Sequence, residues 1–245
     1  MMRLFVINLD NDVTKMNSMD VQLTYMDVPY ERVPAIYGKA LSTLERKRVI
    51  SQFRWWCATG RPVMDAEIGC ALSHFSIYQR MIDENISVAC ILEDDITVSP
   101  KFKECVARVE SLWDVTKPQV VLLSDHTKMY GNVPETDSFE LRKSLNGMCT
   151  DGYCLTKEAA KVLLKQNLPL ITPCDTWGRW VKQGVIELFH ALPSTCKQNQ
   201  LDFGSSTSEG RVYTMSLPLH KWLFHKSKRV VGKVIDFVLQ KWTGR

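Results

Sequence analysis

The 245-residue sequence has no hydrophobic run near the roughly 18 apolar residues that a membrane-spanning helix requires. Its opening segment, MMRLFVINLD, reaches the acidic residue Asp10 without a small-residue cleavage site. This pattern favours a strand over a secretory signal peptide. We therefore expect a cytoplasmic protein whose thiols are reduced.

Closely paired cysteines are also lacking. The eight cysteines are scattered, and none lies in a C-x-x-C pair, so the spacing of a zinc site is absent. Cys90 and Cys154 lie inside apolar runs, where free cysteine behaves as a small hydrophobic residue.

A strong overall charge is missing as well, since the formal net charge is +4. Residues 220–245 hold seven Lys and Arg residues against one acidic residue, Asp236, a net +6 that leaves −2 for the other 219 residues. The basic character therefore belongs to the C-terminal segment, and the nearly neutral main body argues against a nucleic-acid partner.

Apolar runs alternate with helical patterns along the chain. The spacing predicts strands at 4–9, 28–38, 87–92, 119–124, 148–155 and 184–189, helices at 40–53, 65–85, 102–113 and 156–166, and a loop running into a helix at 171–181. This alternation is typical of an α/β, Rossmann-type fold with a mainly parallel sheet and helices on both faces. We expect one domain over 1–217, with a polar loop at 199–216, and a tail over 218–245.

Three consecutive carboxylates, Glu93, Asp94 and Asp95, follow the apolar run 88–92 directly. Like charges this close raise one another's pKa, and a hard divalent cation removes that penalty. Mg²⁺ or Mn²⁺ binds one or two carboxylates and completes its coordination with phosphate oxygens and water. The alternative is a solvated turn that happens to be acidic.

Six segments, in this order within residues 2–206, together resemble a known family: FVINLD (5–10), ERVPAIYG (31–38), AEIGCALSHFSIYQRMID (66–83), ILEDDITVSPKF (91–102), TDGYCLTKEAAKVLL (150–164) and LPSTCKQNQLDFGSS (192–206). The chain resembles bacterial glycosyltransferase family 25, whose members build lipooligosaccharide and lipopolysaccharide outer cores. The resemblance implies a GT-A type fold, a UDP-sugar donor (most often UDP-galactose), an inverting transfer, and a glycolipid or oligosaccharide acceptor.

The resemblance assigns the acidic triplet to the donor. Asp95 is the first choice for the direct metal ligand, with Asp94 or Glu93 sharing the metal or holding the ribose. The metal, Mn²⁺ or Mg²⁺, would neutralise the UDP leaving group.

An inverting transfer also needs a carboxylate that takes the proton from the acceptor hydroxyl. Asp175, within TPCDTWGRW, is the first candidate, with Trp177 and Trp180 as platforms for sugar faces. Asp151 is the second candidate. Asp175 could instead be a helix N-cap.

Residues near the first two predicted strands are candidates for nucleotide binding. Asn8 and Asp10 end the first strand, where a base or ribose could be held, but strand-end turn residues also need no function. Ala35, Ile36 and Gly38 match the family's turn on the nucleotide side, and Gly38 could equally be a turn glycine with positive φ.

Ser73 and His74 are candidate contacts for the donor sugar or diphosphate, and Gln198 matches a late Gln expected to line the donor or acceptor site. A packed helical His and a loop amide are the structural alternatives. A metal site from Glu67, Cys70 and His74, which share a helix face, is discounted because one His with one Cys is a poor ligand set.

Two features depart from the family pattern. Asn11 replaces a basic residue expected shortly after the first strand, and Lys15 is a candidate replacement for the second such residue. The segment RWWCATGRP (54–62) is an insert that could be an acceptor-facing loop, or Trp55 and Trp56 could be core residues.

Apolar residues in the tail recur at helical spacing, from Val231 to Trp242, among lysines and arginines. Such a helix can lie on an anionic bilayer, which would place the protein peripherally on the cytoplasmic face of the bacterial inner membrane. The alternative is an amphipathic helix packed on protein, and Gly232 weakens the helix in either case. The sequence sets no oligomeric state.

Two functions compete with glycosyl transfer. Acidic strand ends also serve metal-dependent phosphohydrolases and nucleotidyltransferases. A non-catalytic, membrane-associated binding module would keep the fold without turnover, and the intact acidic triplet argues against it.

Overall fold

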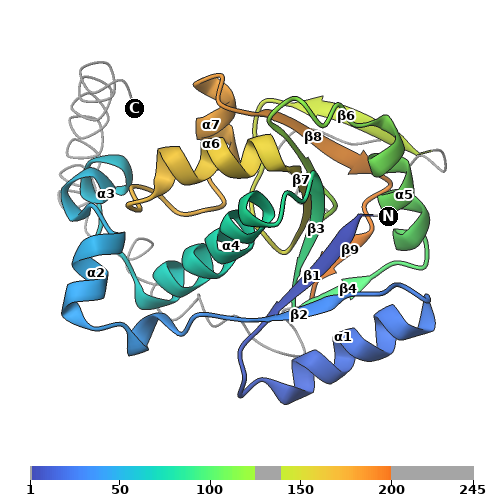
Figure 1. Cartoon of the computed structure of the whole chain (residues 1–245), viewed down its shortest axis with the longest axis horizontal. Coiled ribbons are helices and arrows are strands. Elements are labelled where there is room, and N and C mark those ends of the chain that lie inside the picture. The colour runs from blue at the N-terminus through green and yellow to red at the C-terminus, as the bar shows by residue number, and fades with distance from the viewer. Residues whose placement is uncertain (1, 125–138, 200–245) are drawn as a thin grey trace, which may run out of the picture. The chain divides into compact units, whose positions relative to one another are not determined.

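The computed structural model describes residues 2–124 and 139–199 (Figure 1). The predicted tail at 218–245 lies outside the described residues, as does the predicted loop at 199–216 apart from Asn199. The chain divides into two compact units. Among the described residues, the first unit comprises 2–36, 73–124, 139–164 and 175–199, and the second comprises 37–72 and 165–174.

The first unit contains all the described strands. A seven-stranded sheet has the order β2-β1-β3-β7-β5-β8-β6, and β4 and β9 form a separate antiparallel pair. The strands are β1 (Arg3–Asn8), β2 (Glu31–Pro34), β3 (Val88–Glu93), β4 (Ile96–Val98), β5 (Gln119–Leu122), β6 (Glu140–Ser144), β7 (Gly152–Thr156), β8 (Glu187–Leu192) and β9 (Cys196–Gln198).

The sheet is mixed but mainly parallel. β1 pairs in parallel with β2 and β3, and β5 pairs in parallel with β8. β7 runs antiparallel to β3 and β5, and β6 antiparallel to β8, so β1, β2, β3, β5 and β8 share one direction. The predicted α/β class with a mainly parallel sheet is confirmed.

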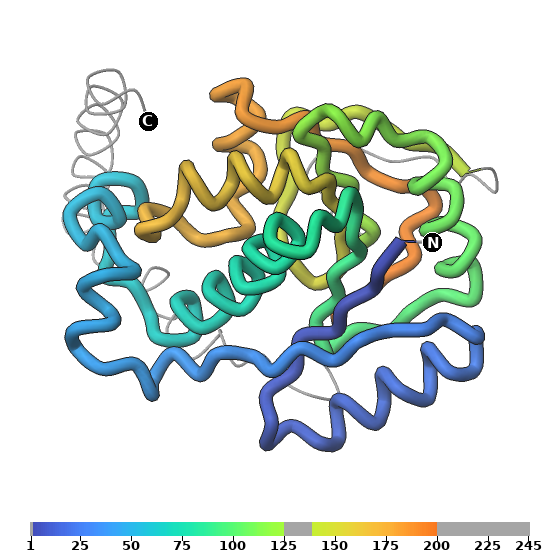
Figure 2. Tube along the Cα trace, in the orientation of Figure 1, coloured from blue at the N-terminus to red at the C-terminus, as the bar shows by residue number. Residues whose placement is uncertain are grey.

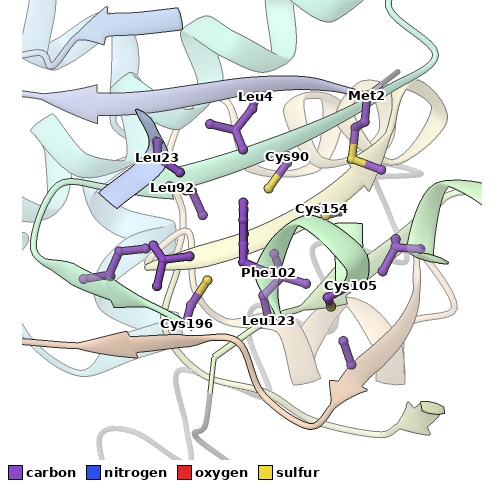
Figure 3. Close-up of a cluster of buried hydrophobic side chains, with 14 of the residues drawn as sticks. Met2, Leu4, Leu23, Cys90, Leu92, Phe102, Cys105, Leu123, Cys154 and Cys196 are labelled. Atoms are coloured by element: carbon purple, nitrogen blue, oxygen red, sulfur yellow. The ribbon is translucent and has the colours of Figure 1, made fainter. Parts of the chain in front are cut away.

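Alternate residues of the central strands face opposite sides of the sheet. Leu4, Cys90 and Cys154 stand in register across β1, β3 and β7, and they share one buried cluster with residues of α1 (Val13–Tyr25) and α5 (Phe102–Leu112) (Figure 3). Phe5 and Tyr153 belong to the opposite face, and there Tyr153 contacts the helix α4 (Asp65–Asp83). Helices therefore cover both faces, as predicted.

Gly152 allows β9 to approach the sheet. A Cβ at this position would lie 2.8 Å from the Cys196 sulfur and 3.0 Å from the Cys196 Cβ. Cys196, Ile96 and Val98 extend the same buried cluster. The close packing brings the β4–β9 pair to the end of β3 that carries the acidic triplet.

The described part of the second unit, residues 37–72 and 165–174, consists mostly of helices. It contains a 3₁₀ turn (Gly38–Ala40), α2 (Thr43–Val49), α3 (Gln52–Thr59) and residues 65–72 of α4, along with the end of α6 (Lys157–Asn167). α3 covers most of the insert at 54–62, and Trp55 is buried while Trp56 is 36% exposed. The acceptor-facing loop considered for this segment is therefore a helix, with one Trp in the core.

Most predicted boundaries lie within a few residues of those in the structure. Figure 2 shows the path of the described chain from its blue N-terminal strand to the orange strands near residue 190. The single helix predicted at 40–53 is instead two helices, because Ile50 forms a β-bridge with Leu170 between them. The last predicted helix is α7 (Trp177–Lys182).

Candidate functional site: the acidic edge of the sheet

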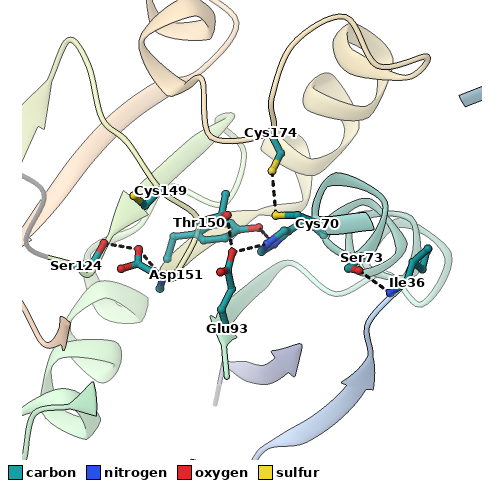
Figure 4. Close-up of polar contacts among 12 residues, drawn as sticks. Ile36, Cys70, Ser73, Glu93, Ser124, Cys149, Thr150, Asp151 and Cys174 are labelled. Atoms are coloured by element: carbon teal, nitrogen blue, oxygen red, sulfur yellow. Dashed lines mark hydrogen bonds and ion pairs between the residues drawn. The ribbon is translucent and has the colours of Figure 1, made fainter. Parts of the chain in front are cut away.

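Polar residues from four strands meet at one edge of the sheet. Asn8 ends β1, Glu93 ends β3, and Ser124 follows β5. β7 runs the opposite way, so Asp151 stands just before its first residue, and its carbonyl accepts a hydrogen bond from the Glu93 N–H at 2.9 Å. The carboxyl ends of parallel strands are where such sheets bind ligands. Figure 4 shows the Asp151 carboxylate next to Ser124 and the Glu93 carboxylate next to Thr150.

Glu93 is held by two neighbouring elements. Its Oε1 accepts a hydrogen bond from the Thr150 hydroxyl at 2.6 Å and lies 3.1 Å from Nε2 of His74. The other ring nitrogen of His74 lies 2.8 Å from the Tyr153 hydroxyl. Burial by itself raises the pKa of Glu93, but the His74 and Thr150 contacts outweigh it and hold the pKa below its ordinary value. Glu93 is therefore ionised at neutral pH, and its carboxylate connects the end of β3 to α4 and to the segment just before β7.

Asp94 faces the end of β1. Its Oδ2 accepts a hydrogen bond from Nδ2 of Asn8 at 2.7 Å, and its Oδ1 lies 3.8 Å from Nζ of Lys15. Burial raises the pKa of Asp94 although Asn8 and Lys15 act against it. Lys15 thus places a positive charge next to the triplet. This position is consistent with the prediction that Lys15 replaces the second basic residue of the family pattern.

Asp95 differs from both neighbours. Its Oδ1 is buried and has no hydrogen-bond partner among the residues that the structure describes. Burial is the main reason that the pKa of Asp95 is raised to about 6, and the charges of Glu93 and Asp94 add to it, while a contact with Gln198 lowers it. A buried carboxylate oxygen without a donor is costly, and a bound cation would remove that cost.

Gln198 lies next to Asp95 through the β4–β9 pair. Ile96 stands opposite Gln198 in this pair, and the Asn199 N–H donates to the Asp95 carbonyl at 2.7 Å. The structure therefore brings the predicted late Gln to the acidic triplet, from a segment about 100 residues away in the chain.

The nucleotide-side candidates are connected by side-chain and backbone contacts. The Asn8 side chain also accepts from Nε of Arg32 at 2.8 Å, and Arg32 pairs with the exposed Asp10 at 2.5 Å. The Ala35 N–H donates to the Asn8 carbonyl at 2.9 Å, which places the turn after β2 beside the end of β1.

The Ser73 hydroxyl accepts a hydrogen bond from the Ile36 N–H at 2.8 Å and is nearly fully buried, so it holds the turn after β2 (Figure 4). Gly38 belongs to the second unit, where a Cβ would lie 1.9 Å from the Asp65 carbonyl oxygen. Its φ is not among the positive ones, so close backbone approach explains the glycine, and the positive-φ turn considered from the sequence is wrong.

The two candidate bases have different surroundings. Asp151 is 1% exposed, and its Oδ1 accepts from the Ser124 hydroxyl at 2.7 Å and from the Gly152 N–H at 3.2 Å. Asp175 is partly exposed and precedes Thr176, which is the N-cap residue of α7. The N-cap explanation considered for Asp175 is therefore wrong.

The prediction that Trp177 and Trp180 form platforms for sugar faces next to Asp175 is also wrong. Trp177 and Trp180 are both fully buried, and the Trp177 indole N–H donates to the Cys149 carbonyl at 2.8 Å. Both tryptophans belong to the hydrophobic core of the first unit, because α7 packs with its apolar face toward that core.

Sequence reasoning missed Thr150, Tyr153 and Arg32. Each acts on a predicted residue, and none is distinctive alone in the sequence. Thr150 and Tyr153 flank Asp151 within the resembling segment TDGYCLTKEAAKVLL, which is the one signal that pointed to this region.

Comparison with known proteins shows the family of this chain. The model of glycosyltransferase family 25 (LPS biosynthesis protein) matches residues 1–177. The chain belongs to glycosyltransferase family 25. The matched region contains the acidic triplet, Asn8, Ser73, His74 and both candidate bases.

The chain is similar to proteins of bacteria and of animals. A putative glycosyltransferase of Haemophilus influenzae is 24% identical over 94% of this chain and 84% of its own length. A family 25 member of Aedes aegypti is 33% identical over 71% of this chain and 30% of its own length. Procollagen galactosyltransferase 2 of Mus musculus is 27% identical over 66% of this chain and 27% of its own length. The chain thus spans less than a third of these animal relatives.

Within the described ranges, no helix has both the length and the apolar character needed to cross a membrane.

Proposed function

We propose that the protein is an inverting, metal-dependent glycosyltransferase. It moves a sugar, galactose in the first instance, from a UDP-sugar to a lipooligosaccharide, lipopolysaccharide or related glycan acceptor. The family description names LPS biosynthesis, and a relative is named a galactosyltransferase. We further propose that it works at the cytoplasmic face of the bacterial inner membrane, with residues 218–245 against the anionic surface.

One observation carries the proposal: Oδ1 of Asp95, close to the Asp94 carboxylate, is buried and has no hydrogen-bond partner within residues 2–124 and 139–199. Carboxylate oxygens are the ligands that Mg²⁺ and Mn²⁺ prefer, so this pair fits a divalent cation with Asp95 as the direct ligand and Asp94 as the second. When bound, the cation supplies positive charge that stabilises the departing diphosphate.

The surrounding residues bind and orient the donor in this proposal. Asn8 fixes the Asp94 carboxylate through its 2.7 Å hydrogen bond, and Lys15 adds a positive charge on the same side. Gln198 lies against Asp95 and closes the site from β9. Asp10 and the turn at Ala35, Ile36 and Gly38 serve the nucleotide. Glu93 serves the ribose, and Ser73 and His74 serve the donor sugar and diphosphate.

Asp175 is the proposed base that accepts the proton of the attacking hydroxyl, with Asp151 as the alternative. Asp175 as a residue is partly exposed, which favours it over the buried Asp151 for contact with an acceptor. The Asp151 carboxylate is buried and already accepts two hydrogen bonds on Oδ1, which suits a positioning role better.

The experiment measures UDP release from a panel of UDP-sugars, each with Mn²⁺, Mg²⁺ or EDTA, and with or without a lipooligosaccharide acceptor. We expect metal-dependent, acceptor-stimulated release from one donor, and its loss in Asp95→Asn. Asp83→Asn is the matched control, because Asp83 is exposed and accepts one hydrogen bond, from Gln79, that Asn can also accept.

Two results would overturn the proposal. One is no release from any donor together with no UDP-sugar binding by calorimetry. The other is nucleotide hydrolysis that the acceptor does not stimulate and that gives no sugar product, which would indicate the phosphohydrolase alternative.

A further inference from the structure

Two thiols of the second unit lie in contact. The sulfur atoms of Cys70 and Cys174 are 3.6 Å apart, although the residues are 104 positions apart in the sequence (Figure 4). A disulfide needs sulfurs about 2 Å apart, so closing this pair requires a movement of the order of 1–2 Å. Rotation of the two cysteine side chains about χ1 supplies a movement of that size.

The segment that carries Cys174 is fixed in place. The Asn167 side chain is 1% exposed, accepts hydrogen bonds from the Ile171 and Thr172 N–H groups, and donates to the Thr172 carbonyl at 3.0 Å. The Leu170 N–H donates to the Val49 carbonyl at 2.7 Å. Cys174 is therefore presented to Cys70 by a well-bonded loop.

The start of α4, which carries Cys70, is equally constrained. Glu67 forms a bidentate ion pair with Arg61, and its Oε2 also accepts a hydrogen bond from the Met64 N–H at 3.1 Å. Arg46 pairs with Asp65 and donates to the Gly38 carbonyl. Both thiols thus stand on rigid supports, so their proximity is built into the unit.

Three other buried thiols, those of Cys90, Cys105 and Cys196, are poorly suited to reaction. Burial raises the pKa of Cys90 and Cys196 well above the ordinary value, and raises that of Cys105 to about 11. Thiols held protonated in this way react slowly. Cys70 is partly exposed, whereas Cys174 is 8% exposed. Cys70 is therefore the more accessible of the two to an oxidant in solvent, and Cys174 is the more buried.

We propose that Cys70 and Cys174 form a reversible disulfide, with Cys70 as the attacking thiol and Cys174 as the resolving thiol. The oxidant is a small disulfide of the glutathione class. The Cys70 thiolate attacks one sulfur, forming a mixed disulfide and releasing one small thiol. The Cys174 thiolate then attacks the Cys70 sulfur, forming the protein disulfide and releasing the second small thiol. The two protein thiols are oxidised, and the small disulfide is reduced to two thiols.

The position of the pair links it to sugar transfer. Cys70 lies one helical turn before His74 on α4, and Cys174 immediately precedes Asp175. A bond between them constrains the chain at a donor-side residue and at the proposed base. This part of the inference rests on the proposed function, and we expect oxidation to lower the transfer rate about tenfold, because small misplacements of reacting groups are costly.

The test treats the full chain with oxidised glutathione, alkylates the remaining thiols, and maps disulfides by non-reducing peptide mass spectrometry. We expect a Cys70–Cys174 cross-linked peptide in the wild type that dithiothreitol reverses. Cys174→Ser should trap glutathione on Cys70, because the resolving thiol is gone. Cys70→Ser should leave Cys174 reduced. Cys149→Ser, which removes another partly exposed thiol, should still form the cross-link.

The proposal is overturned if wild-type Cys70 and Cys174 both remain alkylatable after oxidation, or if stable glutathione adducts or another cysteine pair account for the lost thiols. The mapping does not depend on activity, so it stands apart from any failure of the proposed function. An unchanged transfer rate in the fully cross-linked protein would overturn the link to catalysis.

Discussion

The two sides of the acidic triplet differ although their residues are neighbours in the chain. On one side, Glu93 accepts contacts from Thr150 and His74, and its pKa is lowered. On the other side, Asp95 has a buried oxygen with no hydrogen-bond partner among the described residues, and its pKa is raised to about 6. A carboxylate that the fold already satisfies stabilises structure, whereas one left unsatisfied is suited to a ligand.

The largest expected effect is on turnover. Asp95→Asn keeps the shape of the side chain but weakens cation binding, so metal-dependent UDP release should fall at least about a hundredfold. Steady-state assays over a range of Mn²⁺ concentrations measure it. Turnover within threefold of wild type at all concentrations would remove Asp95 from the metal site.

The second effect is on stability. Glu93→Gln removes the charge that strengthens the His74 and Thr150 contacts, so the free energy of unfolding should fall by about 2 kcal/mol. Because the folded-state pKa is lowered, Glu93 stabilises the protein above its ordinary pKa of 4.5, and this stability is lost as the pH falls through the folded value. Urea unfolding at pH 7 checks the prediction, and an unchanged midpoint would contradict it.

A smaller effect of opposite sign is expected for Asp95→Asn in EDTA. The raised pKa means that ionised Asp95 destabilises the metal-free fold at pH 7, so the variant should be more stable by about 1–2 kcal/mol. As the pH falls below about 6, wild-type Asp95 becomes protonated, and the difference should shrink toward zero near the ordinary value of 3.8. Thermal unfolding at pH 7 and pH 4.5 tests this, and equal stability at pH 7 would count against a desolvated carboxylate.

The smallest effect concerns one contact of Glu93. Thr150→Val removes the 2.6 Å hydrogen bond while keeping nearly the same volume, so it should cost about 1 kcal/mol. Mn²⁺ affinity should stay unchanged, since the lost contact lies on the Glu93 side. Calorimetric Mn²⁺ titration in the presence of UDP measures the affinity. A tenfold weakening would contradict the prediction, because it would show that the contacts of Glu93 also control metal binding at Asp95.

Much of the fold could be predicted from the sequence because buried strands such as 88–93 and 119–122 consist mostly of a continuous apolar run, 88–92 in the first and 120–122 in the second. β6 was missed, since Glu140–Ser144 reads ELRKS and lies at the sheet edge, where no apolar run is needed. The strands β4 and β9 were missed because each is only three residues long and is formed by pairing with the other, far away in the sequence. The reversed direction of β7 likewise depends on pairing that no local pattern records.

The candidate site divides in the same way. The acidic triplet was visible because three carboxylates end a buried strand. The different roles of Glu93 and Asp95 were not, since they depend on α4 and β7 placing His74 and Thr150 beside one carboxylate only. Trp177 and Trp180 misled for a similar reason, because burial is set by packing that the local sequence does not reveal.

Direct Mn²⁺ binding tests the central claim most closely. The signal of free Mn²⁺ in electron paramagnetic resonance, titrated in the presence of UDP, gives the affinity of wild type, Asp95→Asn and Glu93→Gln under identical conditions. The account predicts near-complete loss of binding in Asp95→Asn and retention within about threefold in Glu93→Gln. Retained binding in Asp95→Asn with loss in Glu93→Gln would contradict it.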